Sequence, residues 1–261
     1  MPGPTGRCRR PNHRRTIMDT TIVKGMRVLE ALAASDQARG ISELARELNL
    51  NKSNVQRVLG TLLELGYVTK DPVTSRYAAS LKMWEFGTRV LHRHQIKRAA
   101  QGHLRTLYDK LNETIFLCVG DDGDILYLDK MESAAPVRIS SQTGFRAPAV
   151  KTASGKAILA FQGEEGLNRA LTAALLHFNI VGHNMAQLGE ELAAIRRDGY
   201  AISQSGFRQG VNSIAAPIRG RDGMVIASIA VTGPFERMGK AKMIALAPDL
   251  INTATRISEA L

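Results

Sequence analysis

The chain has little cysteine and no long apolar run, and these two absences narrow the classes of protein to which it can belong. Its 261 residues include two cysteines, Cys8 and Cys118, which lie far apart in sequence. Two isolated cysteines provide neither a disulfide framework nor a cysteine-based metal cluster. No run of about 18 apolar residues occurs, so the sequence predicts no transmembrane helix. Both absences favour a protein of the reducing cytoplasm.

The sequence also lacks the common motifs of enzyme active sites and metal centres. The segment Gly155–Ala157 resembles part of a phosphate-binding loop, but Val150 and Ala157 stand where that motif requires Gly and Ser or Thr. The acidic run Asp121–Asp124 is too short for a calcium loop and lacks its distal Glu. The histidines form no HExxH pattern, and no nucleophile elbow or acid–base pair is evident. The sequence therefore predicts no catalytic residue, metal ligand or cofactor.

What the chain does have is a large excess of positive charge. Its formal net charge is +11 at pH 7. Residues 1–80 carry 13 Lys and Arg against 7 Asp and Glu, so the N-terminal third is the more basic part. An excess of this size is typical of proteins that bind a polyanion, either nucleic acid or an anionic membrane. Residues 1–19, which are rich in Arg and Pro, are expected to form a disordered basic tail.

The apolar pattern between residues 20 and 80 predicts three helices and a hairpin. Asn51 is expected to cap the third helix, and Gly66 to end it. Three helices and a hairpin in under 60 residues are typical of a winged helix-turn-helix. The amphipathic stretches and the hairpin lie at residues 23–33, 44–48, 55–65 and 67–77.

The exposed face of the third helix carries the residue types that read DNA. Basic and amide side chains can bond guanine, adenine or phosphate from the major groove, and basic residues of the hairpin can reach phosphate or the minor groove. A polar helix face can also be merely solvated, so the prediction rests on the whole arrangement of short helix, tight turn, polar face and wing. The predicted DNA-binding residues are Lys52, Ser53, Asn54, Gln56, Arg57, Lys70 and Arg76.

From residue 81 onward the sequence predicts a linking helix and then an α/β domain. Strands and helices alternate after residue 95, which favours a largely antiparallel sheet flanked by helices. Strands are predicted at 114–119, 125–129, 137–141, 200–203, 214–218 and 225–231, and helices at 95–111, 155–161, 188–197 and 243–260. The predicted organisation of this α+β chain is a tail at 1–19, a winged helix-turn-helix at 20–80, a linker helix at 81–94 and an effector-binding domain at 95–261.

Segments spread over residues 21–261 resemble the IclR family of transcriptional regulators. No single motif is decisive, but the order and spacing of the segments are highly specific. The resemblance implies a winged helix-turn-helix joined by a linker helix to a GAF-like effector domain. It also implies dimers, often assembled as tetramers, on palindromic operators, and control of catabolic or uptake genes by a small metabolite, commonly a carboxylate. The matching segments are 41–46, 52–59, 64–68, 125–130, 144–148, 152–157, 195–201, 210–218 and 231–234.

The resemblance further implies an effector pocket over the sheet of the second domain. Backbone N–H groups at the helix start at 153–154 could hold a carboxylate, and Ser and Thr hydroxyls could supply donors and acceptors. The pocket departs from the family pattern: Ser203 replaces a frequent acidic residue, and Lys151, with Arg138 and Arg146, could add positive charge, although a solvated loop is an alternative for these cations. An anionic ligand is therefore expected. The predicted effector-binding residues are Phe145, Lys151, Ala153, Ser154, Ser203, Val211, Ser213, Ala230 and Thr232.

These features predict a cytoplasmic, ligand-responsive transcription regulator without a membrane partner. Its expected partners are a double-stranded DNA operator, a small anionic effector and further copies of itself in a homodimer or homotetramer. Two alternatives stay open. One is an architectural DNA-binding protein without a ligand, whose affinity would be independent of sequence and strongly dependent on salt. The other is an enzyme with an accessory DNA-binding domain and a catalytic site that the sequence does not reveal.

Overall fold

The computed structural model describes residues 20–182 and 184–261, which divide into two compact units between Arg89 and Val90. The tail predicted at residues 1–19 lies outside this described part. Within it, no helix is both long and apolar enough to cross a membrane.

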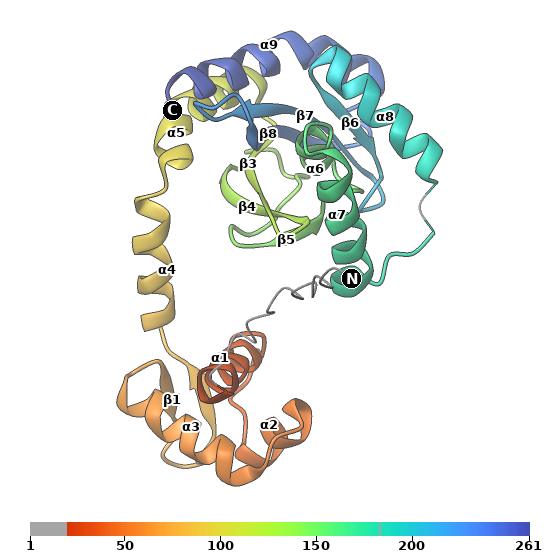
Figure 1. The fold of residues 1–261 in the computed structure, drawn as a ribbon. Coiled ribbons are helices and arrows are strands. Elements are labelled where there is room, and N and C mark those ends of the chain that lie inside the picture. Colours follow the sequence, from red (N-terminus) through yellow and green to blue (C-terminus); the bar gives the residue numbers. More distant parts are fainter. Residues whose placement is uncertain (1–19, 183) are drawn as a thin grey trace, which may run out of the picture. The chain divides into compact units, whose positions relative to one another are not determined.

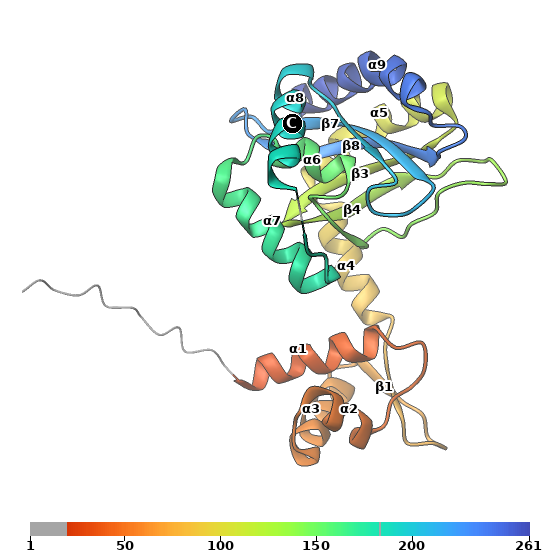
Figure 2. The ribbon, with the colours of Figure 1, turned by 90° about the vertical axis from the view of Figure 1, so that its right-hand side faces the viewer.

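The N-terminal unit contains three helices and a two-stranded antiparallel wing (Figures 1 and 2). Its core is the apolar stripe expected from the sequence, in which Val28, Leu44, Val55 and Leu59 are fully buried. The predicted winged helix-turn-helix is thus confirmed. The elements are α1 (Thr20–Ala33), α2 (Ile41–Leu48), α3 (Lys52–Glu64), β1 (Val68–Lys70) and β2 (Tyr77–Ala79).

The turn between α2 and α3 depends on an asparagine in the left-handed region. Asn49 ends α2 with φ 52° and ψ 51°, a conformation that Asn tolerates better than most residues. The N–H of Leu50 bonds the carbonyl of Ala45 at 2.9 Å and closes the helix end. Asn51 occupies the N-cap of α3 as predicted, but its side chain makes no capping hydrogen bond. The short turn allows α3 to begin at Lys52.

The predicted linking helix is present as α4 (Lys82–His92), and the boundary between the units falls within it. None of its residues is buried within the described chain. Trp84, Phe86 and Val90 are 69%, 61% and 61% exposed, although all three are large and apolar. A helix with such a surface gains little stability from its own chain, so its apolar side chains are available to another molecule.

The C-terminal unit is a three-layer arrangement around a six-stranded sheet of order β5-β4-β3-β8-β7-β6 (Figure 1). All neighbouring strands pair antiparallel, which confirms the predicted sheet type. The strands are β3 (Thr114–Asp121), β4 (Asp124–Met131), β5 (Arg146–Pro148), β6 (Ala201–Gln204), β7 (Val211–Arg219) and β8 (Val225–Pro234). The helices are α5 (Gln95–Leu111) and α9 (Lys240–Glu259) on one face and α6 (Ala153–Leu159), α7 (Gly163–Phe178) and α8 (Met185–Asp198) on the other.

Alternation along the central strands gives the unit two cores. On β3, Ile115 and Leu117 pack into the core under α5 and α9, whereas Phe116 and Cys118 pack into the core under α6, α7 and α8. Successive strand residues point to opposite faces, so a strand covered on both sides is apolar at nearly every position. The near-continuous apolar run of β3 follows from this double cover.

Two sequence predictions in this unit need correction. Residues 137–141 are not a strand, because the carbonyls of Val137 and Ile139 accept hydrogen bonds from side chains, the Arg237 guanidinium at 2.8 Å and the Thr114 hydroxyl at 2.9 Å. They belong to a long connection, the 132–145 segment, and the short strand β5 follows it. Helix α7 was not predicted. Its buried residues are small (Gly166, Ala170, Ala173 and Ala174), which leaves a weak helical pattern.

Candidate functional sites

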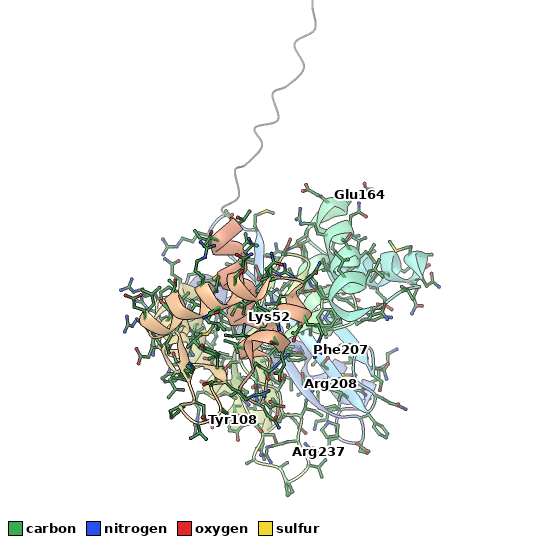
Figure 3. The ribbon with its side chains drawn as sticks, turned by 90° about the horizontal axis from the view of Figure 1, so that it is seen from below. Lys52, Tyr108, Glu164, Phe207, Arg208 and Arg237 are labelled. Atoms are coloured by element: carbon green, nitrogen blue, oxygen red, sulfur yellow. The ribbon has the colours of Figure 1, made fainter. Side chains whose placement is uncertain are left out.

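The first candidate site is the exposed face of α3. Ser53, Gln56, Arg57 and Gly60 lie one turn apart and are all exposed, opposite the buried stripe of the helix. Lys52, labelled in Figure 3, is the first residue of α3 and is also exposed. The predicted residue Asn54 is half-buried. The structure therefore groups four of the five predicted α3 residues on open surface.

The positive charges of this face are not neutralised within the unit. Among the described residues, the ion pairs of this unit join arginines 39, 76 and 89 to glutamates 43, 47 and 85. None of these pairs includes Lys52, Arg57 or the wing residue Lys70. The Lys70 ammonium lies 5.7 Å from the centre of the Tyr77 ring and is exposed at the end of β1. Unpaired cations on a protruding surface are suited to phosphate contacts.

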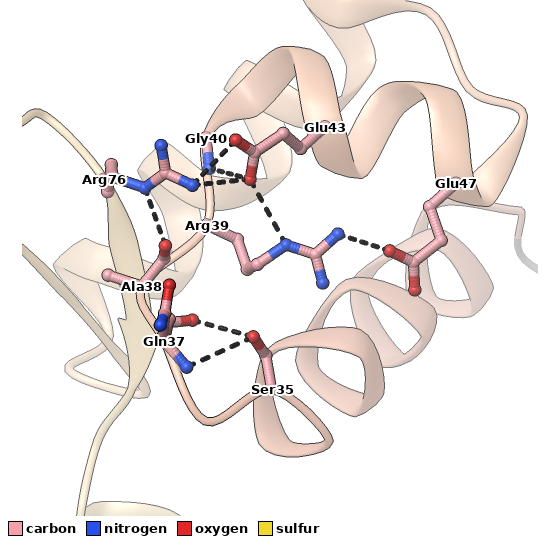
Figure 4. Close-up of polar contacts among 8 residues, drawn as sticks. All are labelled: Ser35, Gln37, Ala38, Arg39, Gly40, Glu43, Glu47 and Arg76. Atoms are coloured by element: carbon pink, nitrogen blue, oxygen red, sulfur yellow. Dashed lines mark hydrogen bonds and ion pairs between the residues drawn. The ribbon is translucent and has the colours of Figure 1, made fainter.

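Arg76, the other predicted wing residue, has a different role (Figure 4). Its guanidinium donates to both carboxylate oxygens of Glu43, at 2.7 and 2.8 Å, and to the carbonyl of Ala38 at 2.7 Å. The N–H of Gly40 also bonds Glu43, and these two partners lower the pKa of that carboxyl, with the Gly40 hydrogen bond the larger cause. Arg76 therefore joins β2 to the start of α2, a structural role that the sequence did not indicate, and its DNA contact stays a prediction.

The second candidate site is a cavity on the face of the sheet covered by α6. The strand register places Ser203, Ser213 and Thr232 opposite one another, so that hydroxyls form a row across β6, β7 and β8. Two residues further along β7 and β8 on the same face, Ala215 pairs with Ala230. The small alanines allow α6 to pack closely, and the cavity lies over the hydroxyl row.

Six of the nine predicted effector-binding residues line this cavity, namely Lys151, Ser154, Ser203, Val211, Ser213 and Thr232. The other three do not. Phe145 lies behind Tyr127, with their rings stacked at 5.8 Å, while Ala153 and Ala230 are buried in the core between α6 and the sheet. The cavity is also lined by residues that were not predicted: Phe116, Tyr127, Ile139, Ser141, Thr152, Phe207 and Arg208.

The charged side chains that line the cavity are all positive. Two cations, Lys151 and Arg208, line it, and its lining contains no Asp or Glu. The arginines expected to help from sequence are engaged elsewhere: Arg138 bonds Glu132 at 2.8 Å, and Arg146 bonds Asp121. An anion could therefore enter without meeting a negative side chain.

The polar groups of the cavity are mostly neutral donors and acceptors. Burial raises the pKa of the Tyr127 phenol, which keeps it protonated. The Ser141 hydroxyl is buried and has no hydrogen-bond partner among the described residues. Such a group costs free energy unless something bonds it, so its position in a cavity wall indicates a site for a polar ligand or water.

The cavity is small, and its volume indicates that a wall must move for a metabolite to enter. It holds about 50 Å³, room for a few water molecules. Ligand sites usually enclose roughly 300–1,000 Å³. The exposed turn between β6 and β7 carries Phe207 and Arg208 and is the wall least held by secondary structure.

Family models match both units of the chain. The family model described as IclR helix-turn-helix domain matches residues 21–72, and the model described as bacterial transcriptional regulator IclR C-terminal matches residues 88–259. The HTH-type transcriptional regulator KdgR of Dickeya chrysanthemi is 30% identical over 243 residues, which cover 91% of this chain and 78% of that protein. The transcriptional repressor IclR of Escherichia coli is 25% identical over 244 residues, which cover 91% of this chain and 88% of that protein.

Solved structures share the fold. The Thermotoga maritima IclR structure is 28% identical with a TM-score of 0.70, and the match covers 92% of this chain and 98% of that one. An IclR homologue from Microbacterium hydrocarbonoxydans, solved in complex with 4-hydroxybenzoate, is 21% identical with a TM-score of 0.76, covering 92% of this chain and 98% of that one.

Proposed function

The chain belongs to the IclR family of bacterial transcriptional regulators, and we propose that it binds an operator through α3 and senses a small anionic metabolite in the cavity beside α6. Members of this family are regulators rather than enzymes. The single observation that carries the sensing role is the lining of the cavity, which has two cations, several hydroxyls and no carboxylate. We place this activity in the cytoplasm, where the DNA lies, and expect it at catabolic or uptake genes.

The DNA-binding role is supported by the free cations of α3 and the wing. Gln56 and Arg57 occupy the middle of the exposed face, where their side chains can bond base edges, whereas Lys52 and Lys70 are suited to phosphates. Half of a palindromic operator would be read by each copy of the chain.

We propose that a second copy covers the exposed face of α4. Phe86 and Val90, which lie one turn apart on α4, provide the apolar surface, and a Cβ placed at Gly87 would meet no atom within 4 Å, so another backbone could approach closely there. Burial of these side chains would contribute about 1.5–3 kcal/mol each. A symmetric dimer follows from a self-complementary face, and a palindromic operator requires one.

Regulation would work by population shift. A metabolite that binds one arrangement of the paired effector units more tightly than another changes the populations of these arrangements. Any change in the spacing of the two DNA-reading units away from the roughly 34 Å half-site repeat would cost operator affinity.

A thermal-shift screen of the purified chain against small carboxylates, sugar acids and aromatic acids tests the sensing role. A ligand at about 100 times its Kd should add roughly 2.7 kcal/mol of stability and raise the melting temperature. The shift should vanish in Ser213→Leu, which fills the cavity, and in Lys151→Glu, which inverts a lining charge. Chemical conversion of an acid during the screen would instead support the alternative that the chain is an enzyme. A flat screen combined with sequence-independent, salt-sensitive DNA binding would favour an architectural protein.

A further inference from the structure

We propose that Arg208 determines the charge specificity of the effector cavity, by forming a two-point contact with a carboxylate of the bound metabolite. The inference rests on the proposed sensing function and names the residue that gives it selectivity. No sequence pattern indicated this residue, which lies in the turn between β6 and β7.

The guanidinium of Arg208 is positioned by aromatic rings. Its central carbon lies 5.1 Å from the centre of the Phe145 ring and 5.8 Å from that of Phe207. Figure 3 shows Phe207 and Arg208 next to each other. An arginine on an aromatic face keeps the edge of its planar fork free for an anion.

Among the described residues Arg208 has no anionic partner, unlike three other arginines of the C-terminal unit. Arg138 bonds Glu132, Arg146 bonds Asp121, and Arg237 bonds both oxygens of Glu113. Within the described part of the chain, Arg208 makes neither an ion pair nor a side-chain hydrogen bond, although its residue lines the cavity. The guanidinium therefore has its full capacity for a ligand carboxylate.

The turn that carries Arg208 packs closely against Lys151. A Cβ at Gly206 would lie 2.5 Å from the carbonyl oxygen of Lys151, so the turn passes directly over that residue. The Ser203 hydroxyl bonds the same carbonyl at 3.0 Å. These contacts bring Arg208 and Lys151 to one cavity, where the planar fork can take two carboxylate oxygens and the ammonium can supply a second charge.

Isothermal titration of the whole chain tests this role with three acids, pyruvate, gluconate and 4-hydroxybenzoate, and with their uncharged amides. Arg208→Gln removes the charge and keeps a polar side chain, and Arg208→Lys keeps the charge without the planar fork. The matched control is Arg105→Gln, since Arg105 also lies near a ring, 5.9 Å from the centre of Tyr108, but on α5 rather than in the cavity lining.

For any acid that binds the wild type, Arg208→Gln should weaken binding about tenfold to a hundredfold, the effect of losing a charge-assisted contact. Arg208→Lys should bind the acid with an affinity between those of the wild type and Arg208→Gln, and Arg105→Gln should bind it as tightly as the wild type. The uncharged amide of the same acid should bind the wild type and Arg208→Gln with equally low affinity. An acid that binds Arg208→Gln as tightly as the wild type would overturn the role of Arg208 and leave the sensing function standing. Failure of all three acids to bind the wild type, combined with a flat thermal-shift screen and sequence-independent DNA binding, would overturn both.

Discussion

Substitution of Gly60 by alanine should stabilise the fold and weaken DNA binding, two effects of opposite sign. Gly60 lies inside α3, is exposed, and a Cβ at this position would meet no atom within 4 Å. Alanine in a helix interior is more favourable than glycine by about 0.5–1 kcal/mol. For a domain of this size the melting temperature of the N-terminal unit should rise by a few degrees.

The effect on DNA follows from the direction in which Gly60 faces. It lies one turn beyond Gln56 and Arg57 on the same exposed face. If α3 reads the major groove, the added methyl group occupies space between the helix and the DNA. Displacement of one bidentate base contact costs about 1–3 kcal/mol, a loss of about fivefold to a hundredfold in affinity.

The assay pairs calorimetric melting with fluorescence anisotropy on a DNA duplex that the wild type has selected from a random pool. Gly189→Ala is the matched control, since Gly189 is an exposed glycine inside α8 whose Cβ would also meet nothing within 4 Å. It should stabilise the C-terminal unit without changing DNA affinity. Unchanged operator affinity in a stabilised Gly60→Ala variant would refute the assignment of this face to DNA.

Three further outcomes are expected. Lys70→Ala should weaken binding to all DNA sequences alike and reduce the slope of log affinity against log salt by about one, in filter-binding titrations. Hydrogen bonds from Lys130 and Arg138 lower the pKa of the Glu132 carboxyl from 4.5 to about 2. The stability that the ionised carboxylate contributes is therefore present above its ordinary pKa and is lost as the pH falls toward 2. In Glu132→Gln the melting temperature should depend less on pH over this acid range. Gly206→Ala should displace the β6–β7 turn and abolish effector shifts in thermal melts while preserving DNA binding, because its Cβ would lie 2.5 Å from the Lys151 carbonyl oxygen.

Helices α5 and α7 show why one helix could be predicted from sequence and the other could not. Helix α5 was predicted at its observed bounds, because Ile96, Leu104 and Leu107 mark its buried face. Helix α7 buries glycine and alanine instead, while Leu175 and Leu176 are exposed, so its hydrophobic pattern does not indicate the buried face. Apolar periodicity reports burial only when the buried side chains are large.

The strand predicted at 137–141 is absent for a different reason. Its composition suits a strand, but a strand requires a neighbour, and the carbonyls of Val137 and Ile139 instead accept from Arg237 and Thr114. Both donors are distant in sequence, the guanidinium 100 residues away and the hydroxyl 25. Propensity within a short window contains no information about such partners.

The arginine that supplies positive charge to the proposed effector cavity could likewise not be identified from a short stretch of sequence. Arg138, Arg146 and Arg208 look alike in the sequence, and only their carboxylate neighbours separate them. The partner of Arg138 is six residues away, whereas that of Arg146 is 25 residues away across the sheet. Because the lining contains no carboxylate, the charge of Arg208 has no opposite charge beside it in the cavity wall. Of these three arginines, tertiary pairing therefore leaves only Arg208 without a carboxylate partner among the described residues, and Lys151 is the other cation of the lining.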